Sequence, residues 1–187
     1  MNKNDLEQNV EKKLVKINLG CGKVILPEFI NVDSIELPGV NVLHDVNDLP
    51  LPFDDASASE IHCISILEHV DFVPLLQDLH RILTSGGSVE ILVPHFSSPD
   101  AYRDPTHIRY FTAGSFDFFV TGHKRDYYFD FRFSNVSHKI QFEKRKLFFY
   151  NYALEWFVNL SHDMQSWYEK TPLRAFPAQG IKITLTK

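Results

Sequence analysis

The sequence lacks the features that mark several large classes of protein. Only two of its 187 residues are cysteines, Cys21 and Cys63, which is too few for a disulfide framework and fits free thiols in a reducing cytoplasm. No apolar run approaches the roughly 18 residues that a membrane-spanning helix needs. Lysine and arginine total 19 against 24 acidic residues, and they form no basic run. We therefore expect a cytoplasmic protein with no membrane span and no nucleic-acid partner bound through phosphates.

What the sequence does contain is sufficient for a packed core. Hydrophobic residues make up 44% of the chain, and 16 of them are phenylalanines. The length is typical of one domain, so we expect residues 1–187 to form a single domain.

An apolar run ends at Leu19 and leads directly into Gly20-Cys21-Gly22. The run predicts a buried strand over residues 15–19. Two glycines one residue apart let the backbone turn sharply and let a ligand lie against main-chain N–H groups. A nucleotide-like cofactor needs this arrangement at the end of the first strand of an open α/β sheet. A plain strand-ending turn gives the same pattern, so the glycines alone leave both interpretations open.

The segment after the glycines is too short for the usual dinucleotide site. A second strand, residues 30–33, ends in Asp33 only 13 residues after Gly20, and Ile25 stands where a third glycine is expected. A crossover that includes a helix needs about 10–12 residues or more, and Pro27 interrupts this one. We predict a loop or a single turn over residues 20–28. A pyrophosphate would then lose its helix N-terminus, whereas a cofactor without phosphate would not need one.

The remaining pattern predicts an α/β fold with a Rossmann-like, mostly parallel sheet. We expect the first crossover helix to be short or missing, and a C-terminal antiparallel strand pair to complete the sheet. The sparse helices leave one face of the sheet to be covered by the N-terminal segment, by the helix at 147–160 or by a second subunit, so a homodimer is one candidate. The expected strands are 15–19, 30–33, 40–43, 61–65, 89–93, 131–142 and 181–185, and the expected helices start at about Asp5, at Asp71 (ending at Gly86-Gly87), at Thr112 and at Leu147.

Five short motifs occur in a fixed order over about residues 14–95. They are Leu-Gly-Cys-Gly at 19–22, Val-Asp at 32–33, the Leu-Pro-Leu-Pro-Phe segment within 45–55, Leu-Glu-His at 67–69, and the stretch from Leu79 to Gly87. In this order they resemble the class I S-adenosylmethionine-dependent methyltransferases that act on small molecules. The resemblance implies a methyltransferase with S-adenosyl-L-methionine as its cofactor.

The same resemblance assigns cofactor roles to the strand ends. Asp33 would accept the ribose hydroxyls, and Asp45 the adenine amino group, although Asp48, Asp54 and Asp55 are rivals on the same loop. The backbone roles fall to Gly20 and Gly22 (N–H groups toward the methionine carboxylate), Cys21 (a small residue that fits the loop), Val46 (against the ring) and Ser65 (a carbonyl toward the ammonium).

The loop after the fifth expected strand contains Asp-Pro-Thr-His-x-Arg-x-Phe at 104–111. This pattern resembles bacterial methyltransferases found with polysaccharide and glycan biosynthesis, so we expect a small-molecule or saccharide acceptor and O-methylation. His107 is the best candidate for the base or for the residue that orients the acceptor, because imidazole titrates near neutrality and Asp104 could hold its ring. His95 is the rival. A plain turn at Asp104 and a surface His107 paired with it would produce the same sequence.

Two further questions stay open at this stage. Glu68 and His69 are too few ligands to predict a metal ion, so we expect none. A methyltransferase-like protein that binds the cofactor without turnover, and a nicotinamide-dependent oxidoreductase, are the alternatives to the enzyme. The position of Ile25 and the early Asp33 argue against the oxidoreductase.

Overall fold

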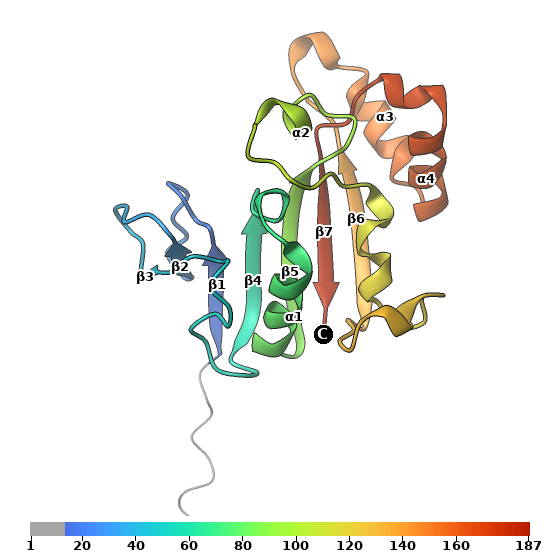
Figure 1. Cartoon of the computed structure of the whole chain (residues 1–187). Helices are drawn as coiled ribbons and strands as arrows, with labels where there is room; N and C mark the ends of the chain where they lie inside the picture. Colours follow the sequence, from blue (N-terminus) through green and yellow to red (C-terminus); the bar gives the residue numbers. More distant parts are fainter. Residues whose placement is uncertain (1–13) are drawn as a thin grey trace, which may run out of the picture.

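The computed structural model describes residues 14–187, and its centre is one seven-stranded sheet (Figure 1). The strand order is β3-β2-β1-β4-β5-β7-β6. The first five strands are parallel, and β7 pairs antiparallel with both β5 and β6, which confirms the predicted fold class. The strands are β1 (Val15–Leu19), β2 (Ile30–Asp33), β3 (Val42–Leu43), β4 (Ala58–Ile64), β5 (Leu83–Pro94), β6 (Asn135–Gln141) and β7 (Gly180–Thr186).

The connections between the first strands are short, as predicted. Residues 20–28 contain turns and no helix, and the link from β2 to β3 has none either. The first α-helix, α1 (Phe72–Ile82), connects β4 to β5. We expected it to end at Gly86-Gly87, which was wrong. The chain becomes extended at Leu83 and pairs there with Ala58 of β4, so both glycines lie within β5.

One face of the sheet is apolar and covered. Alternate residues along each central strand point into it, because side chains in a strand alternate between faces. Three leucines of α1 pack on this face. Phenylalanines from η3 (Ala113–Phe119) and from the segment that follows it extend the cover. The fully buried members include Ile61, Ile91, Ile183, Leu75, Leu76, Leu79, Phe116 and Phe133.

The other face of the sheet is polar, and its charges are paired. Lys16 on β1 lies 2.9 Å from Glu60 on β4, and Glu60 also contacts His62 at 2.8 Å. Farther along the sheet, Lys182 on β7 lies 2.8 Å from Glu90 on β5. A face of this kind is compatible with water and does not require a cover, so the expected cover by the N-terminal segment or by a second subunit stays a prediction. The homodimer stays a prediction, and the helix expected from Asp5 lies outside the described residues.

The C-terminal helices form a second, smaller layer beyond β6. They are α3 (Asn151–Val158) and α4 (His162–Lys170), and they pack Val158 and Tyr168 against Ile140 and Phe142. The expected helix at 147–160 is therefore shorter, and α4 was not predicted. Ser161 begins α4 by accepting the Met164 N–H at 3.2 Å. Within residues 14–187, no helix is long and apolar enough to cross a membrane.

Substitutions on the two faces of the sheet should differ in how much they lower the free energy of unfolding. Leu76 lies on the buried side of α1 and is fully buried, so Leu76→Ala should lower the free energy of unfolding by about 2–5 kcal/mol. Glu90 belongs to a partly exposed ion pair, so Glu90→Ala should cost no more than about 1 kcal/mol. Urea unfolding of both variants checks this, and equal costs would contradict the assignment of the two faces.

His80 on α1 predicts a pH effect on stability. Its Nε2 lies 3.0 Å from the Arg132 carbonyl oxygen, and its ring packs edge-on against Phe133. Burial, together with the positive charge of Lys187, lowers the pKa of His80. The unfolded chain, with an ordinary histidine pKa near 6.5, therefore takes up this proton first, so stability is lost as the pH falls from about 7 toward 5.

The variant His80→Gln keeps a donor for that carbonyl oxygen and cannot titrate. Its stability should fall less than that of the parent protein between pH 7 and pH 5. Urea unfolding at both pH values measures the difference, and identical losses in the two proteins would refute the role of His80.

Candidate functional site

The glycine turn forms the centre of the carboxyl edge of the sheet. Gly20 and Gly22 both have positive φ, +62° and +50°, which side chains other than glycine rarely adopt. A Cβ at Gly20 would lie 1.8 Å from Ile66 Cδ1, whereas a Cβ at Gly22 would meet nothing within 4 Å. Gly22 therefore borders open space that a ligand can use.

Asp33 is tied to this turn. Its Oδ2 accepts the Gly22 N–H at 2.7 Å, and its Oδ1 accepts the Ile35 N–H at 3.0 Å. We expected the Gly22 N–H to be free for a ligand carboxylate, but it is already used by Asp33. Each carboxylate oxygen keeps a second lone pair, so Asp33 can still accept a ligand hydroxyl.

Cys21 is a buried structural residue in this turn. Its N–H donates to the Val32 carbonyl oxygen at 3.0 Å, which joins the ends of β1 and β2. Burial raises the pKa of the Cys21 thiol, and the nearby charge of Asp33 adds to the effect. The thiol therefore stays protonated near neutrality and acts as a small apolar group.

The other predicted cofactor residues lie at the ends of β3 and β4. Ser65 follows β4 with φ +56°, and its N–H donates to the Leu92 carbonyl oxygen at 2.8 Å. Asp45 is exposed beyond β3, and Asn47 bonds to its Oδ1, which lowers the pKa of Asp45. Val46 is half-buried and packs against the core. The strand order brings Gly20, Gly22, Asp33 and Ser65 to neighbouring strand ends, with Asp45 at the outer end of the same edge.

His95 is fully buried and holds the end of β5 to α4. Its Nδ1 accepts the Ser97 N–H at 3.1 Å, so its Nε2 carries the proton and donates to Glu169 Oε1 at 3.1 Å. The same Glu169 oxygen accepts the Ala113 N–H at 2.7 Å. Both ring nitrogens are used, which leaves none to face an acceptor. Sequence reasoning missed Glu169 because it lies 74 positions from its partner.

His107 and Asp104 lie close together, but they are not paired as we predicted. The His107 Nδ1 contacts the Ala101 carbonyl oxygen at 3.0 Å. Asp104 Oδ1 instead accepts both the N–H and the hydroxyl of Thr106, which lowers the pKa of Asp104. An aspartate followed two residues later by threonine closes its own local turn, and this competes with a bond to the imidazole.

Glu68 and His69 belong to a one-turn helix, η2 (Leu67–His69), that follows β4. The Glu68 carbonyl oxygen accepts the N–H groups of Ile108 and Arg109, at 2.8 and 3.3 Å, and these bonds bring His107 beside the pair. Burial raises the pKa of the Glu68 carboxyl, against the opposing effect of its backbone hydrogen bond and of His107. The sequence showed the pair but not the third residue, because His107 is 38 positions from His69.

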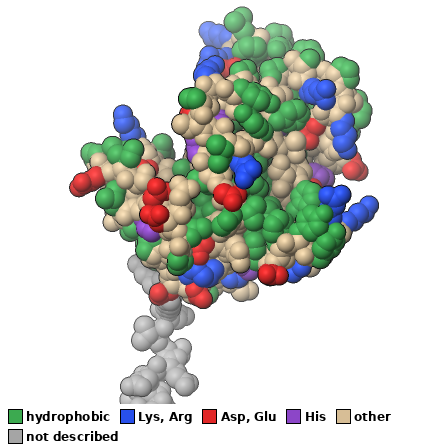
Figure 2. All heavy atoms as spheres, viewed as in Figure 1, with side chains coloured by type: hydrophobic (Ala, Val, Ile, Leu, Met, Phe, Trp, Pro, Cys, Tyr) green, Lys and Arg blue, Asp and Glu red, His purple; other side chains and the backbone are tan. Residues whose placement is uncertain are grey.

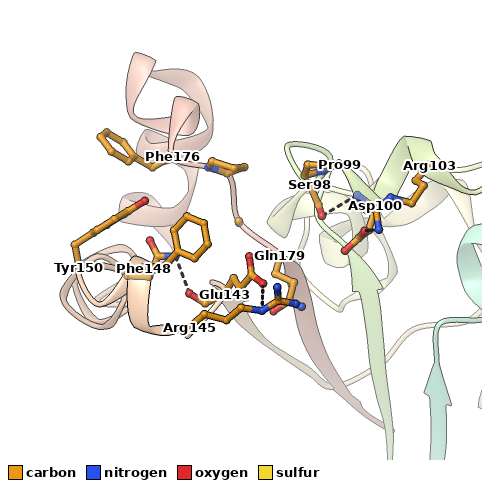
Figure 3. Close-up of a pocket in the computed structure, with 13 residues that line it drawn as sticks. Ser98, Pro99, Asp100, Arg103, Glu143, Arg145, Phe148, Tyr150, Phe176 and Gln179 are labelled. Carbon is orange, nitrogen blue, oxygen red and sulfur yellow. Dashed lines mark hydrogen bonds and ion pairs between the residues drawn. The ribbon is translucent and has the colours of Figure 1, made fainter.

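A cavity lies beside this edge rather than on the glycine turn. It has a volume of about 420 Å³ and lies between α2 (Asp100–Arg103), the start of β7 and the segment before α3 (Figure 3). Its wall combines aromatic and apolar side chains with charged and amide groups, among them Phe148, Tyr150, Phe176, Arg103, Glu143, Arg145 and Gln179. On the molecular face drawn in Figure 2, Lys and Arg side chains lie at separate places and do not form one basic patch.

Comparison with known proteins gives structural matches only. No family model and no curated protein sequence matches the chain. An S-adenosylmethionine-dependent methyltransferase from Archaeoglobus fulgidus superposes with a TM-score of 0.61 at 18% identity, over 94% of this chain and 86% of its own. A possible histamine N-methyltransferase from Thermotoga maritima superposes with a TM-score of 0.54 at 16% identity, over 92% and 81%.

A third match was solved with a product of the cofactor. It is a plantazolicin methyltransferase in complex with S-adenosylhomocysteine and a monoazolic desmethylPZN analogue, with a TM-score of 0.53, 14% identity, and coverage of 93% of this chain and 76% of its own. At such identities the likeness establishes the fold and nothing finer. The chain therefore has the Rossmann-like fold found in S-adenosylmethionine-dependent methyltransferases.

Proposed function

We propose that this protein is an S-adenosylmethionine-dependent methyltransferase that acts on a hydroxyl group of a small-molecule or saccharide acceptor. The observation that carries the proposal is the Gly20–Gly22 turn, braced by Asp33 at the carboxyl edge of a sheet whose fold superposes on that of such an enzyme. Ligands of open α/β sheets bind at this edge.

The residues at this edge fit the cofactor. The space at Gly22 admits a ligand against the backbone, and Asp33 has lone pairs left for the two ribose hydroxyls. Asp45 and Val46 would hold the adenine, while Gly20, Cys21 and the Ser65 carbonyl would border the methionine part. When bound, S-adenosylmethionine supplies a methyl group made electrophilic by its sulfonium. A phosphate-free cofactor also agrees with the absence of a helix over residues 20–28, because no pyrophosphate needs a helix N-terminus there.

The lining of the 420 Å³ cavity supports a saccharide acceptor. Aromatic faces such as Tyr150 and Phe176 can stack on a sugar ring, while Arg145 and Gln179 can bond to its hydroxyls. Asp100 and Arg103 line the same cavity. They are the first and last residues of α2, directly before the loop that carries His107. The acceptor would enter through this cavity and present one hydroxyl toward the cofactor.

His107 is the side chain that we assign to the acceptor hydroxyl, as its base or as the group that orients it. The ring is half-buried, and the Ala101 carbonyl oxygen holds it in place through Nδ1, so Nε2 remains to contact a ligand. His95, our other candidate, has both nitrogens engaged inside the protein, and Asp104 acts on Thr106 rather than on the His107 ring. We therefore propose that both residues position the loop.

A cytoplasmic setting agrees with the cysteines. Cys21 and Cys63 are both free and buried, and burial raises the pKa of the Cys63 thiol to about 12. A reducing compartment suits a chain that keeps both thiols unpaired.

The cofactor assignment predicts an effect of Asp33. Asp33→Ala should weaken S-adenosylhomocysteine binding by about 1–3 kcal/mol, because the ribose hydroxyls lose a half-buried acceptor. Isothermal titration calorimetry measures the affinity, and Glu36→Ala, which removes an exposed carboxylate from the segment after Asp33, is the matched control. Unchanged affinity in a folded Asp33→Ala protein would contradict the assignment of Asp33 to the ribose hydroxyls.

The acceptor assignment predicts an effect of His107. His107→Ala should keep its affinity for S-adenosylhomocysteine and lose roughly 10²–10⁴-fold in turnover, the usual contribution of a proton-transfer group. The control His123→Ala removes an imidazole that packs on Phe118 instead. Methyl transfer to a panel of saccharides and small alcohols provides the readout. Cofactor binding with no transfer to any acceptor would favour the non-catalytic alternative.

A further inference from the structure

Three side chains that could bind a metal ion meet beside the proposed cofactor site. Glu68 and His69 come from η2, and His107 comes from the loop after α2. One ligand atom from each lies within 4.8 Å of the others. The two imidazole rings are arranged edge to face, with centroids 4.7 Å apart.

Glu68 is the unusual member of this cluster. Its side chain is 1% exposed, and neither carboxylate oxygen bonds to another residue among residues 14–187, so that the nearby N–H of Glu68 itself gives the charge only local support. A carboxylate buried without a partner is costly, so such groups in proteins are normally paired or bound to a metal ion. The carbonyl oxygen of Glu68, by contrast, accepts the N–H groups of both Ile108 and Arg109. The side chain is therefore held in place with its oxygens unused.

The two histidines are held in the form that binds metal. A carbonyl oxygen can only accept, so the His107 Nδ1 must carry its proton and donate to Ala101 at 3.0 Å. The Thr106 hydroxyl donates to Asp104 at 2.6 Å, so it accepts from the His69 Nδ1 at 2.8 Å. Both Nε2 atoms then carry a lone pair. Metal-binding histidines in proteins commonly donate their other N–H in this way.

A second cluster in the chain provides a comparison. Asp117, His138 and His162 also gather potential ligand atoms within 4.8 Å. There the carboxylate is already paired with both imidazoles, at 2.9 Å to His138 and 3.1 Å to His162. The His138 Nε2 makes no well-aligned hydrogen bond there, but it still lies in ion-pair contact with Asp117, and no buried carboxylate oxygen is left without a partner in that cluster. The charge of Asp117 therefore needs no metal ion to balance it.

We propose that Glu68, His69 and His107 bind a divalent transition-metal ion of the Zn²⁺, Co²⁺ or Mn²⁺ type. Two imidazole nitrogens and one carboxylate oxygen suit such ions better than Mg²⁺ or Ca²⁺, which prefer oxygen ligands. Three protein ligands leave coordination positions open, as at catalytic rather than structural sites. This proposal differs from the expectation from the sequence that no metal is bound.

The role of the ion rests on the proposed function, whereas its binding rests on the three side chains alone. An acceptor hydroxyl on an open position would be oriented by the ion and would release its proton to solvent more readily, because a metal-bound oxygen is more acidic. The effect of His107 on the acceptor would then be exerted through the ion.

Metal titration of the full chain tests the site. Protein stripped with a chelator is titrated with Co²⁺, followed by its visible absorption, and then with Zn²⁺ as a competitor by calorimetry. We expect one equivalent to bind. Glu68→Gln and His107→Ala should each weaken binding by more than the roughly 10–100-fold that loss of an outer-shell partner costs.

Two variants make the result specific. Thr106→Val leaves all three ligands in place and removes the hydroxyl that accepts from His69 and donates to Asp104, so it should weaken Co²⁺ binding about 10–100-fold even if Glu68→Gln does not fold. His162→Gln alters the second cluster and should leave binding unchanged. The proposal is overturned if the stripped protein binds neither ion, or if His162→Gln abolishes binding while Thr106→Val and His107→Ala do not.

The same samples separate this proposal from the proposed function. Metal binding without S-adenosylhomocysteine binding would support the metal site and would contradict the proposed methyltransferase function. S-adenosylhomocysteine binding and methyl transfer by a protein that holds no metal overturn the site and leave the methyltransferase standing.

Discussion

The burial of only one face of the sheet is the constraint on which the rest of the structure depends. The links from β1 to β2 and from β2 to β3 are too short to contain helices. No helix from these links covers the sheet, so the strand side chains on one face are open to solvent. Those side chains are charged and paired, as in Lys16–Glu60 and Glu90–Lys182. The fully buried apolar residues of the central strands point to the opposite face, where α1 and the phenylalanine-rich segment after it cover them.

This constraint also shapes the carboxyl edge of the sheet. Without a helix after β1, the glycine turn has no helix N-terminus beside it, and Asp33 takes the Gly22 N–H instead. The turn is therefore braced by the next strand, which suits a ligand recognised through hydroxyls and an amino group rather than through phosphates. The large connections all follow β5, so the walls of the cavity come from the second half of the chain (Figure 1).

The bonds of the Glu68 carbonyl oxygen join the two halves of the site. They tie the loop that carries His107 to the turn after β4. The same contact buries the Glu68 side chain and places two imidazoles beside it, each with its Nδ1 engaged. A single pair of backbone hydrogen bonds thus connects the proposed cofactor edge to the loop that borders the acceptor cavity. This explains why chemistry-bearing residues far apart in the sequence converge here.

The sequence by itself determined the strands, the glycine turn and the missing first helix, because these follow from local patterns of apolar residues, glycine, proline and segment length. Strands β1 and β2 begin and end where the periodicity predicted, whereas α1 ends before Gly86 because pairing of Leu83 with Ala58 overrides the local signal. Only the tertiary structure decided the partners of the polar side chains. Asp104 bonds to Thr106, the buried His95 bonds to Glu169, and the Glu68 side chain lies beside His107. These contacts depend on how distant segments pack, and a hydrogen bond is sensitive to small changes in distance and angle that no sequence pattern encodes.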